Sequence, residues 1–142
     1  MKAAIFGGAG KPIAIESVPD PVPGRDQVVV KVGLCGICGT DMHMTEKHES
    51  GQAFLPPAGA SLGHEFCGEV VALGTGVKRL TIGDRISAMP IVGCGVCAAC
   101  LSGHPFACTQ MQTLYGGFGE YALVNANFSV PLPKALSLVA QV

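Results

Sequence analysis

The chain has 142 residues, of which 49% are hydrophobic and 13% are charged, and its formal net charge is −1. This composition predicts one compact globular domain and excludes a nucleic-acid groove, because there is no basic stripe and the 6 Phe and 2 Tyr are not interleaved with Arg or Lys. The apolar fraction is high for so few charges. We therefore expect exposed apolar surface that contacts another domain, a partner chain or a second copy.

Short apolar runs separated by Gly- and Pro-bearing turns predict a mainly β fold, an antiparallel barrel or sandwich. The proline-rich segment 19–24 is predicted to form a turn before one such run, and segment 74–83 is predicted to be loop and turn. A single short helix is predicted to start at Thr40 or Asp41, either of which could cap it. The predicted strands are 3–6, 28–34, 69–73, 85–88 and 121–124.

The N-terminal residues do not have the pattern of a secretory signal. Residues 1–4 contain one lysine and lead directly into a predicted strand, with no apolar core before Gly7. No apolar run approaches the length of a membrane span, so no membrane partner is expected. We expect a cytoplasmic protein whose 7 cysteines are reduced and available to metals.

Four closely spaced cysteines predict a structural zinc site in a lobe at 89–110. Small residues fill the gaps between the cysteines and let four thiolates approach one another. Metal binding in such small sites is worth roughly 10 to 16 kcal/mol near neutral pH, so chelation should loosen this lobe. The four residues are Cys94, Cys97, Cys100 and Cys108.

An iron–sulfur cluster is the alternative interpretation of the same cysteines. Bacterial ferredoxins share the first two spacings, but a gap of three residues precedes their fourth cysteine and proline follows it. Here the last gap is seven residues and Thr109 follows Cys108, which favours zinc. Visible absorbance of the purified protein would reverse this preference.

A second candidate metal site is divided between two segments of the chain. Cys38 follows one predicted strand and His64 precedes another, so a thiolate and an imidazole converge if those strands are neighbours. Glu65 is an occasional ligand or an adjacent carboxylate that tunes the ion. Catalytic zinc usually has three protein ligands and an open fourth position, so this set is incomplete. Singly, Cys38, His64 and His43 also fit a buried thiol, a core histidine and a solvated helix residue.

Taken together, these motifs resemble the zinc-containing medium-chain dehydrogenases, the alcohol dehydrogenase family, through their GroES-like catalytic domain. The resemblance covers residues 1–133 and implies a GroES-like β-barrel with an inserted four-cysteine zinc lobe and short helices. It rests on the four cysteines and on segments 36–43, 63–65, 83–85 and 116–121.

The resemblance also implies roles for individual residues. Cys38 and His64 match ligands of the catalytic zinc, with Glu65 as the nearby carboxylate. Thr40 matches the hydroxyl that hydrogen-bonds the alcohol, and His43 matches the histidine that passes its proton towards solvent. Zinc lowers the pKa of a coordinated oxygen, which allows hydride to leave for NAD or NADP. The expected substrate is a small alcohol, aldehyde or ketone.

The family places a doubly wound nucleotide-binding domain and a third catalytic zinc ligand further along the chain. Residues 134–142 resemble the start of that connection, and 74–76 lack the third glycine of a dinucleotide fingerprint. We therefore expect no cofactor-binding residue within this chain, weak zinc at Cys38 and His64, and no turnover by this chain alone. The alternative is a free-standing zinc-binding structural or partner-subunit module without redox turnover.

Overall fold

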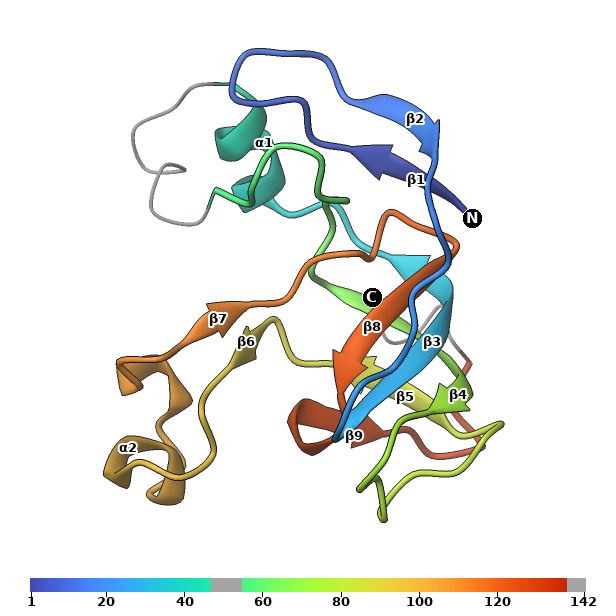
Figure 1. The fold of residues 1–142 in the computed structure, drawn as a ribbon, viewed down its shortest axis with the longest axis vertical. Coiled ribbons are helices and arrows are strands. Elements are labelled where there is room, and N and C mark those ends of the chain that lie inside the picture. The colour runs from blue at the N-terminus through green and yellow to red at the C-terminus, as the bar shows by residue number, and fades with distance from the viewer. Residues whose placement is uncertain (47–54, 138–142) are drawn as a thin grey trace.

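A computed structural model of the chain describes residues 1–46 and 55–137. Its body is a curled antiparallel sheet of five strands in the order β8-β3-β4-β5-β9 (Figure 1). These strands are β3 (Gln27–Cys35), β4 (Phe66–Leu73), β5 (Arg85–Ala88), β8 (Tyr121–Asn125) and β9 (Ser129–Pro131).

Two short strand pairs extend this body. The first joins β1 (Lys2–Ile5) to β2 (Ala14–Ser17), and the second joins β6 (Ile91–Val92) to β7 (Gln112–Thr113). The helices within residues 1–46 and 55–137 are all short: α1 (Gly39–Thr45), α2 (Ala98–Leu101) and the 3-10 helices η2 (Pro105–Ala107) and η3 (Ala126–Phe128). Among the described residues, no helix has the length and apolar character needed to cross a bilayer.

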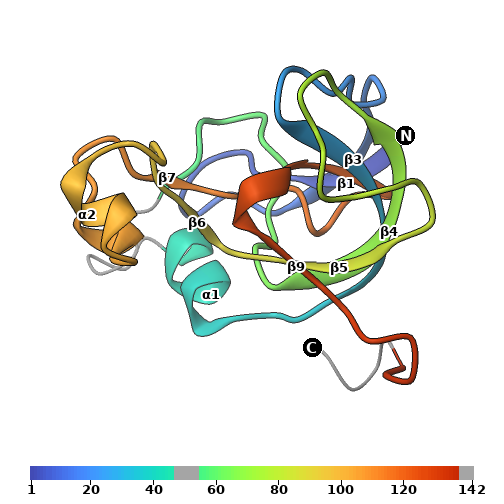
Figure 2. The same cartoon turned by 90° about the horizontal axis from the view of Figure 1, so that it is seen from below.

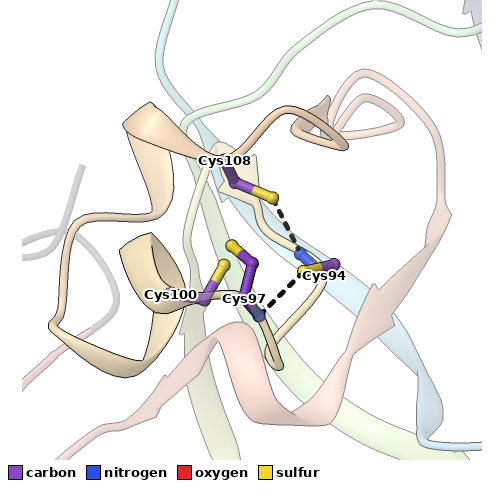
Figure 3. Close-up of side chains that lie close together, drawn as sticks. All are labelled: Cys94, Cys97, Cys100 and Cys108. Carbon is purple, nitrogen blue, oxygen red and sulfur yellow. Dashed lines mark hydrogen bonds between the residues drawn. The ribbon is translucent and has the colours of Figure 1, made fainter.

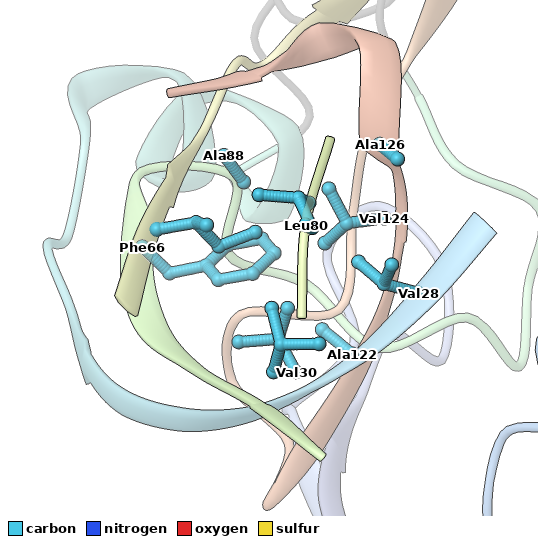
Figure 4. Packing of buried hydrophobic residues seen from close by; sticks show 10 residues of the cluster. Val28, Val30, Phe66, Leu80, Ala88, Ala122, Val124 and Ala126 are labelled. Carbon is cyan, nitrogen blue, oxygen red and sulfur yellow. The ribbon is translucent and has the colours of Figure 1, made fainter. Parts of the chain in front are cut away.

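The main core lies inside the curl of the sheet (Figure 4). Alternating residues of β3 and β8, such as Val28, Val30 and Val124, point inward and are fully buried. Burying each such side chain contributes about 1.5 to 3 kcal/mol to stability. The β3–β4 ladder is irregular at two places, because its register shifts between Val29 and Val30 and again between Val32 and Leu34. The sheet therefore fixes where the end of β3 meets the start of β4.

A second, smaller core holds α1 in place. Phe6, Met44 and Leu62 are buried together, and Tyr115 and Phe118 pack against them. The Tyr115 hydroxyl lies 3.8 Å from the Met44 sulfur. This core fixes α1, which follows directly on Cys38, against β1 and the segment before His64.

The predicted mainly β fold is confirmed, and each predicted strand is present within three residues of its expected bounds. The prediction that Thr40 or Asp41 caps the helix is wrong. The helix begins at Gly39 with Cys38 as its N-cap residue. Asp41 lies in the first turn, where its Oδ2 accepts a hydrogen bond of 3.0 Å from the backbone N–H of Cys38.

The four-cysteine lobe projects to one side of the sheet in both views, on a stem made by β6 and β7 (Figure 2). At the other end of the chain, the Arg85 guanidinium donates hydrogen bonds to the carbonyls of Pro133 and Leu136. The described part of the tail is therefore tied to β5. The rest of the predicted tail, 138–142, lies outside the described residues.

Candidate metal centres

The four lobe cysteines form one compact cluster, with their sulfur atoms all within 4.8 Å of one another (Figure 3). A tetrahedral zinc site with Zn–S bonds of about 2.3 Å separates its sulfurs by roughly 3.8 Å, so this cluster fits a zinc ion. All seven cysteines are free thiols. Turns and the short helices α2 and η2 bring the four sulfurs together.

Backbone N–H groups point at the lobe sulfurs. The N–H of Cys97 lies 3.4 Å from Cys94 Sγ, and the N–H groups of Cys94 and Gln110 each lie 3.4 Å from Cys108 Sγ. Donation from the N–H groups of Val96 and Cys97 lowers the pKa of Cys94 to about 6. Such contacts prepare the sulfurs to act as thiolate ligands.

The four thiols do not ionise equally. At Cys100 the N–H of Gly95 favours the thiolate, but burial and the neighbouring thiols outweigh it and raise the pKa to about 11. A cation must therefore displace protons to recruit all four sulfurs, and binding should strengthen with pH.

The second cluster brings together Cys38, which follows the end of β3, and His64 and Glu65, which precede the start of β4. Cys35 at the end of β3 pairs with Phe66 at the start of β4, and the N–H of Gly36 donates to the carbonyl of Glu65 at 2.8 Å. One donor atom from each of the three residues lies within 4.8 Å of the others. The condition set by the sequence, that the two strands be neighbours, is met.

Asp41 is a component of this cluster that sequence reasoning missed. Its Oδ1 lies 3.5 Å from His64 Nδ1, and both side chains are buried. Neither atom has a hydrogen-bond partner in the described part of the chain, so the contact is an ion pair when His64 is protonated. Because Nδ1 faces the carboxylate, Nε2 is the nitrogen left for an ion.

The Asp41–His64 pair shifts both pKa values. Interaction with Asp41 raises the pKa of His64 to about 9, against the opposing effect of burial. Burial would raise the pKa of Asp41, but His64 and the N–H of Cys38 outweigh it and lower that pKa. Without metal, His64 is therefore protonated at neutral pH, and an ion must displace that proton.

Gly63 fixes the backbone immediately before His64. Its φ is +80°, and a Cβ there would lie 2.8 Å from the Phe118 nitrogen and 2.9 Å from Cys35 Sγ. A Cβ on Gly117 would meet the same sulfur at 2.6 Å. Cys35 is thus a small residue between two glycines, and burial raises the pKa of its thiol to about 11.

The mixed cluster opens into a pocket of about 230 Å³. A larger hollow of about 300 Å³ near Arg85 and Lys134 contains none of the clustered donors. Thr40 reaches the smaller pocket, with its Oγ1 3.6 Å from Cys38 Sγ. The pocket is lined by Cys38, Thr40, His64, Glu65, Pro90, Ile91, Phe106 and Thr113.

His43 and Tyr115 lie near the mixed cluster but contact different surroundings. His43 is exposed on α1 and is not among the lining residues, so the proton transfer expected of it would need a water or a movement. Tyr115 packs edge-on against the His64 ring, with centroids 6.4 Å apart and an interplanar angle of 85°. No spacing signal in the sequence identified Tyr115, Phe106 or Thr113, because only the fold brings them to this site.

Comparison with known proteins places this fold and these clusters in a family. Residues 24–134 match the family described as alcohol dehydrogenase GroES-like domain. The chain is 39% identical over 140 residues to an L-threonine 3-dehydrogenase of Stenotrophomonas maltophilia (strain K279a), covering 96% of this chain and 41% of that protein. It therefore spans about two fifths of the length of that relative.

Solved structures agree. A short chain alcohol dehydrogenase (rspB) from Escherichia coli CFT073, complexed with NADH, is 34% identical with a TM-score of 0.86, covering 99% of this chain and 41% of that one. The 2R,3R-butanediol dehydrogenase from Bacillus subtilis is 33% identical with a TM-score of 0.83, covering 99% and 42%. The chain belongs to the alcohol dehydrogenase GroES-like domain family, within the zinc-containing medium-chain dehydrogenases.

Proposed function

We propose that this chain is the catalytic domain of a zinc- and nicotinamide-dependent dehydrogenase that interconverts a small secondary alcohol and its ketone. The convergence of Cys38, His64 and Glu65 on one pocket carries the proposal. Two relatives support the substrate class, since L-threonine 3-dehydrogenase and 2R,3R-butanediol dehydrogenase are both named for secondary alcohols.

In this proposal Cys38, His64 and Glu65 hold the catalytic ion, while the four lobe cysteines hold a structural one. A zinc ion in the pocket would lower the pKa of an alcohol hydroxyl and favour its oxidation. The Thr40 hydroxyl, beside Cys38 Sγ, orients the substrate oxygen by hydrogen bonding. His43 accepts the proton through water at the exposed face of α1 and releases it to solvent.

Asp41 is a positioning residue in this scheme. It faces His64 Nδ1 and also accepts a hydrogen bond from the N–H of Cys38. The Asp41 carboxylate thus orients two of the three donors, because one oxygen accepts from the Cys38 backbone and the other faces the His64 ring. The preferred ring nitrogen for the ion is then fixed before any ion arrives.

We propose that residues outside this 142-residue sequence bind the nicotinamide acceptor. The matched relatives are more than twice as long, since this chain covers about 41% of them. Residues 74–76 form a turn between β4 and β5, which is not a phosphate-binding turn before a helix. We propose that this chain alone does not turn over and that a nucleotide-binding domain or partner completes the site.

The test is alcohol-dependent reduction of NAD or NADP by the protein in its native assembly, followed by the absorbance of the reduced nicotinamide. Cys38→Ser should abolish turnover, and Cys35→Ser is the matched control, because Cys35 lies in the same segment but does not line the pocket. Equal activity of the Cys38→Ser variant and the unsubstituted protein would contradict the proposal.

A second candidate is a free-standing zinc-binding module without redox turnover. It is favoured by one observation: the four-sulfur cluster is complete within 94–108, whereas the mixed cluster has only three donors among the described residues. Metal analysis of protein purified without added metal separates the two. One zinc per chain that vanishes in Cys97→Ser, with no nicotinamide reduction in any assembly, supports the module. Two zinc per chain, falling to one, supports the dehydrogenase.

A further inference from the structure

The pocket beside Cys38 and His64 is lined in part by the four-cysteine lobe and by the stem that carries it. Ile91 in β6 and Thr113 in β7 are register partners in the stem of the four-cysteine lobe, and both line the pocket. Phe106 lies in η2, inside the lobe and two residues before Cys108, and it lines the same pocket. One side of the pocket is therefore made by the lobe and its stem.

Apart from the cysteine cluster, the described residues of the lobe hold Phe106 in place mainly through backbone hydrogen bonds. Neither α2 nor η2 contains a buried residue. Residues 86–119 contain no Asp, Glu, Lys or Arg, so no ion pair between carboxylate and ammonium or guanidinium groups can form within that stretch. The turn at Phe106 is closed by short-range bonds, such as the N–H of Cys108 to the carbonyl of Pro105 at 3.1 Å.

The stem and the cluster are also packed directly on each other. A Cβ added to Gly93 would lie 2.5 Å from Cys100 Sγ and 3.3 Å from the Pro105 Cβ. Gly93 follows β6, so the position of η2 relative to the pocket depends on how the four sulfurs are drawn together. A metal ion is the group that fixes those sulfurs.

We propose that the four-cysteine cluster controls ligand selection at the mixed cluster: with its metal bound, it holds Phe106 as the apolar wall of the pocket. The wall favours ligands with an apolar chain. Phe106 is 71% exposed, and with Ile91 and Pro90 it supplies the apolar part of a lining that also contains the polar donors. A hydroxyl group placed near Cys38 and His64 would direct an alkyl chain along Phe106.

This inference rests on the proposed function for the choice of alcohols, but its test needs neither nicotinamide nor turnover. The readout is the alkylation of Cys38 by iodoacetamide, resolved from the other cysteines by peptide mass spectrometry. A ligand in the pocket shields Cys38, so the concentration of hexan-1-ol that halves the rate reports its binding. Ethanol, too short to reach along the wall, is the companion ligand.

In Phe106→Ala and in Cys97→Ser, the half-protecting concentration of hexan-1-ol should rise about tenfold, the loss expected for roughly 60 Å² of apolar contact. Protection by ethanol should stay unchanged. Leu101→Ala is the matched control, because Leu101 is 75% exposed on the same lobe but does not line the pocket.

Phe106→Ala keeps all four cysteines, so it tests the wall even if Cys97→Ser disturbs more than the lobe. Unchanged protection in Phe106→Ala overturns the role of this side chain, and full protection in a metal-depleted Cys97→Ser chain overturns the coupling. Lack of any protection by hexan-1-ol in the unsubstituted chain overturns the whole inference. Loss of nicotinamide reduction with this pattern intact would instead count only against the proposed function.

Discussion

The two clusters of this molecule are built in opposite ways. The four lobe cysteines lie within 94–108 and are joined by turns and single-turn helices, so the cluster organises its own surroundings. The mixed cluster joins Cys38 to His64 across the β3–β4 pair, so the sheet organises the cluster. We therefore expect a metal bound in the lobe to support the structure there, whereas at the pocket the structure would position the metal.

The two clusters also differ in how deeply their side chains are buried. Three of the lobe sulfurs belong to half-exposed residues, and α2 and η2 bury no side chain. His64 and Asp41 are only 6% and 3% exposed. A compact cluster of identical soft ligands can therefore form near the surface, whereas an imidazole and a carboxylate need a packed interior to hold one geometry.

The largest expected effect comes from removing the lobe metal. Cys97→Ser, or chelation, should make the 89–110 segment at least roughly tenfold more sensitive to limited proteolysis, because a structural zinc site contributes most of the folding energy of so small a lobe. The measurement is the cleavage rate together with zinc per chain. Cleavage sites in β3 and β4 should stay protected. A lobe that stays resistant to proteolysis without metal would contradict the idea that the metal holds the lobe together.

Gly63→Ala should destabilise the segment that positions His64 at the pocket. The substitution forces a Cβ against the Phe118 nitrogen at a φ of +80°, so we expect the free energy of unfolding to fall by about 2 to 4 kcal/mol. Denaturant unfolding measures this loss. Gly59→Ala is the control, because its φ is +93° but no atom lies within 4 Å of the added Cβ, leaving only the backbone strain of about 1 kcal/mol.

Asp41→Asn should weaken metal binding at the mixed cluster alone. The variant loses the charge that faces His64 Nδ1, and loss of such a partner typically lowers metal affinity about 10- to 100-fold. Competition titration with a chromophoric chelator would resolve the two sites. Asp84→Asn, whose carboxylate accepts a hydrogen bond from the N–H of Thr81 in a distant turn, should leave both affinities unchanged.

The last prediction is a pH dependence of stability in the metal-free chain. The folded pKa of His64, about 9, lies above its ordinary value near 6.5, so its pairing with Asp41 stabilises the chain fully below about pH 6.5. That contribution should be lost as pH rises through about 9. Denaturant midpoints across this range measure it, and Asp41→Asn, with the same cysteines, should show a shallower decline.

Much of this architecture could be predicted from the sequence. Short apolar runs between Gly- and Pro-bearing turns predicted β3 and β8, and the spacing of the four cysteines predicted their cluster. The helix start was misplaced by a residue or two, because Asp41 bonds backwards to Cys38 and does not cap. Strands β2, β6, β7 and β9 were missed because they are short or polar and pair only through the fold.

The sequence by itself determined what depends on neighbours along the chain: the strands, the turns and the four-sulfur cluster, whose geometry follows from spacing. The tertiary structure alone decided which distant residues share the pocket. Asp41 beside His64, Tyr115 against the His64 ring, and Phe106 in the same pocket as Cys38 share no spacing pattern in the sequence. They meet because β3 pairs with β4 and because the lobe stem reaches the same pocket. Such contacts depend on the burial of apolar surface across the whole domain.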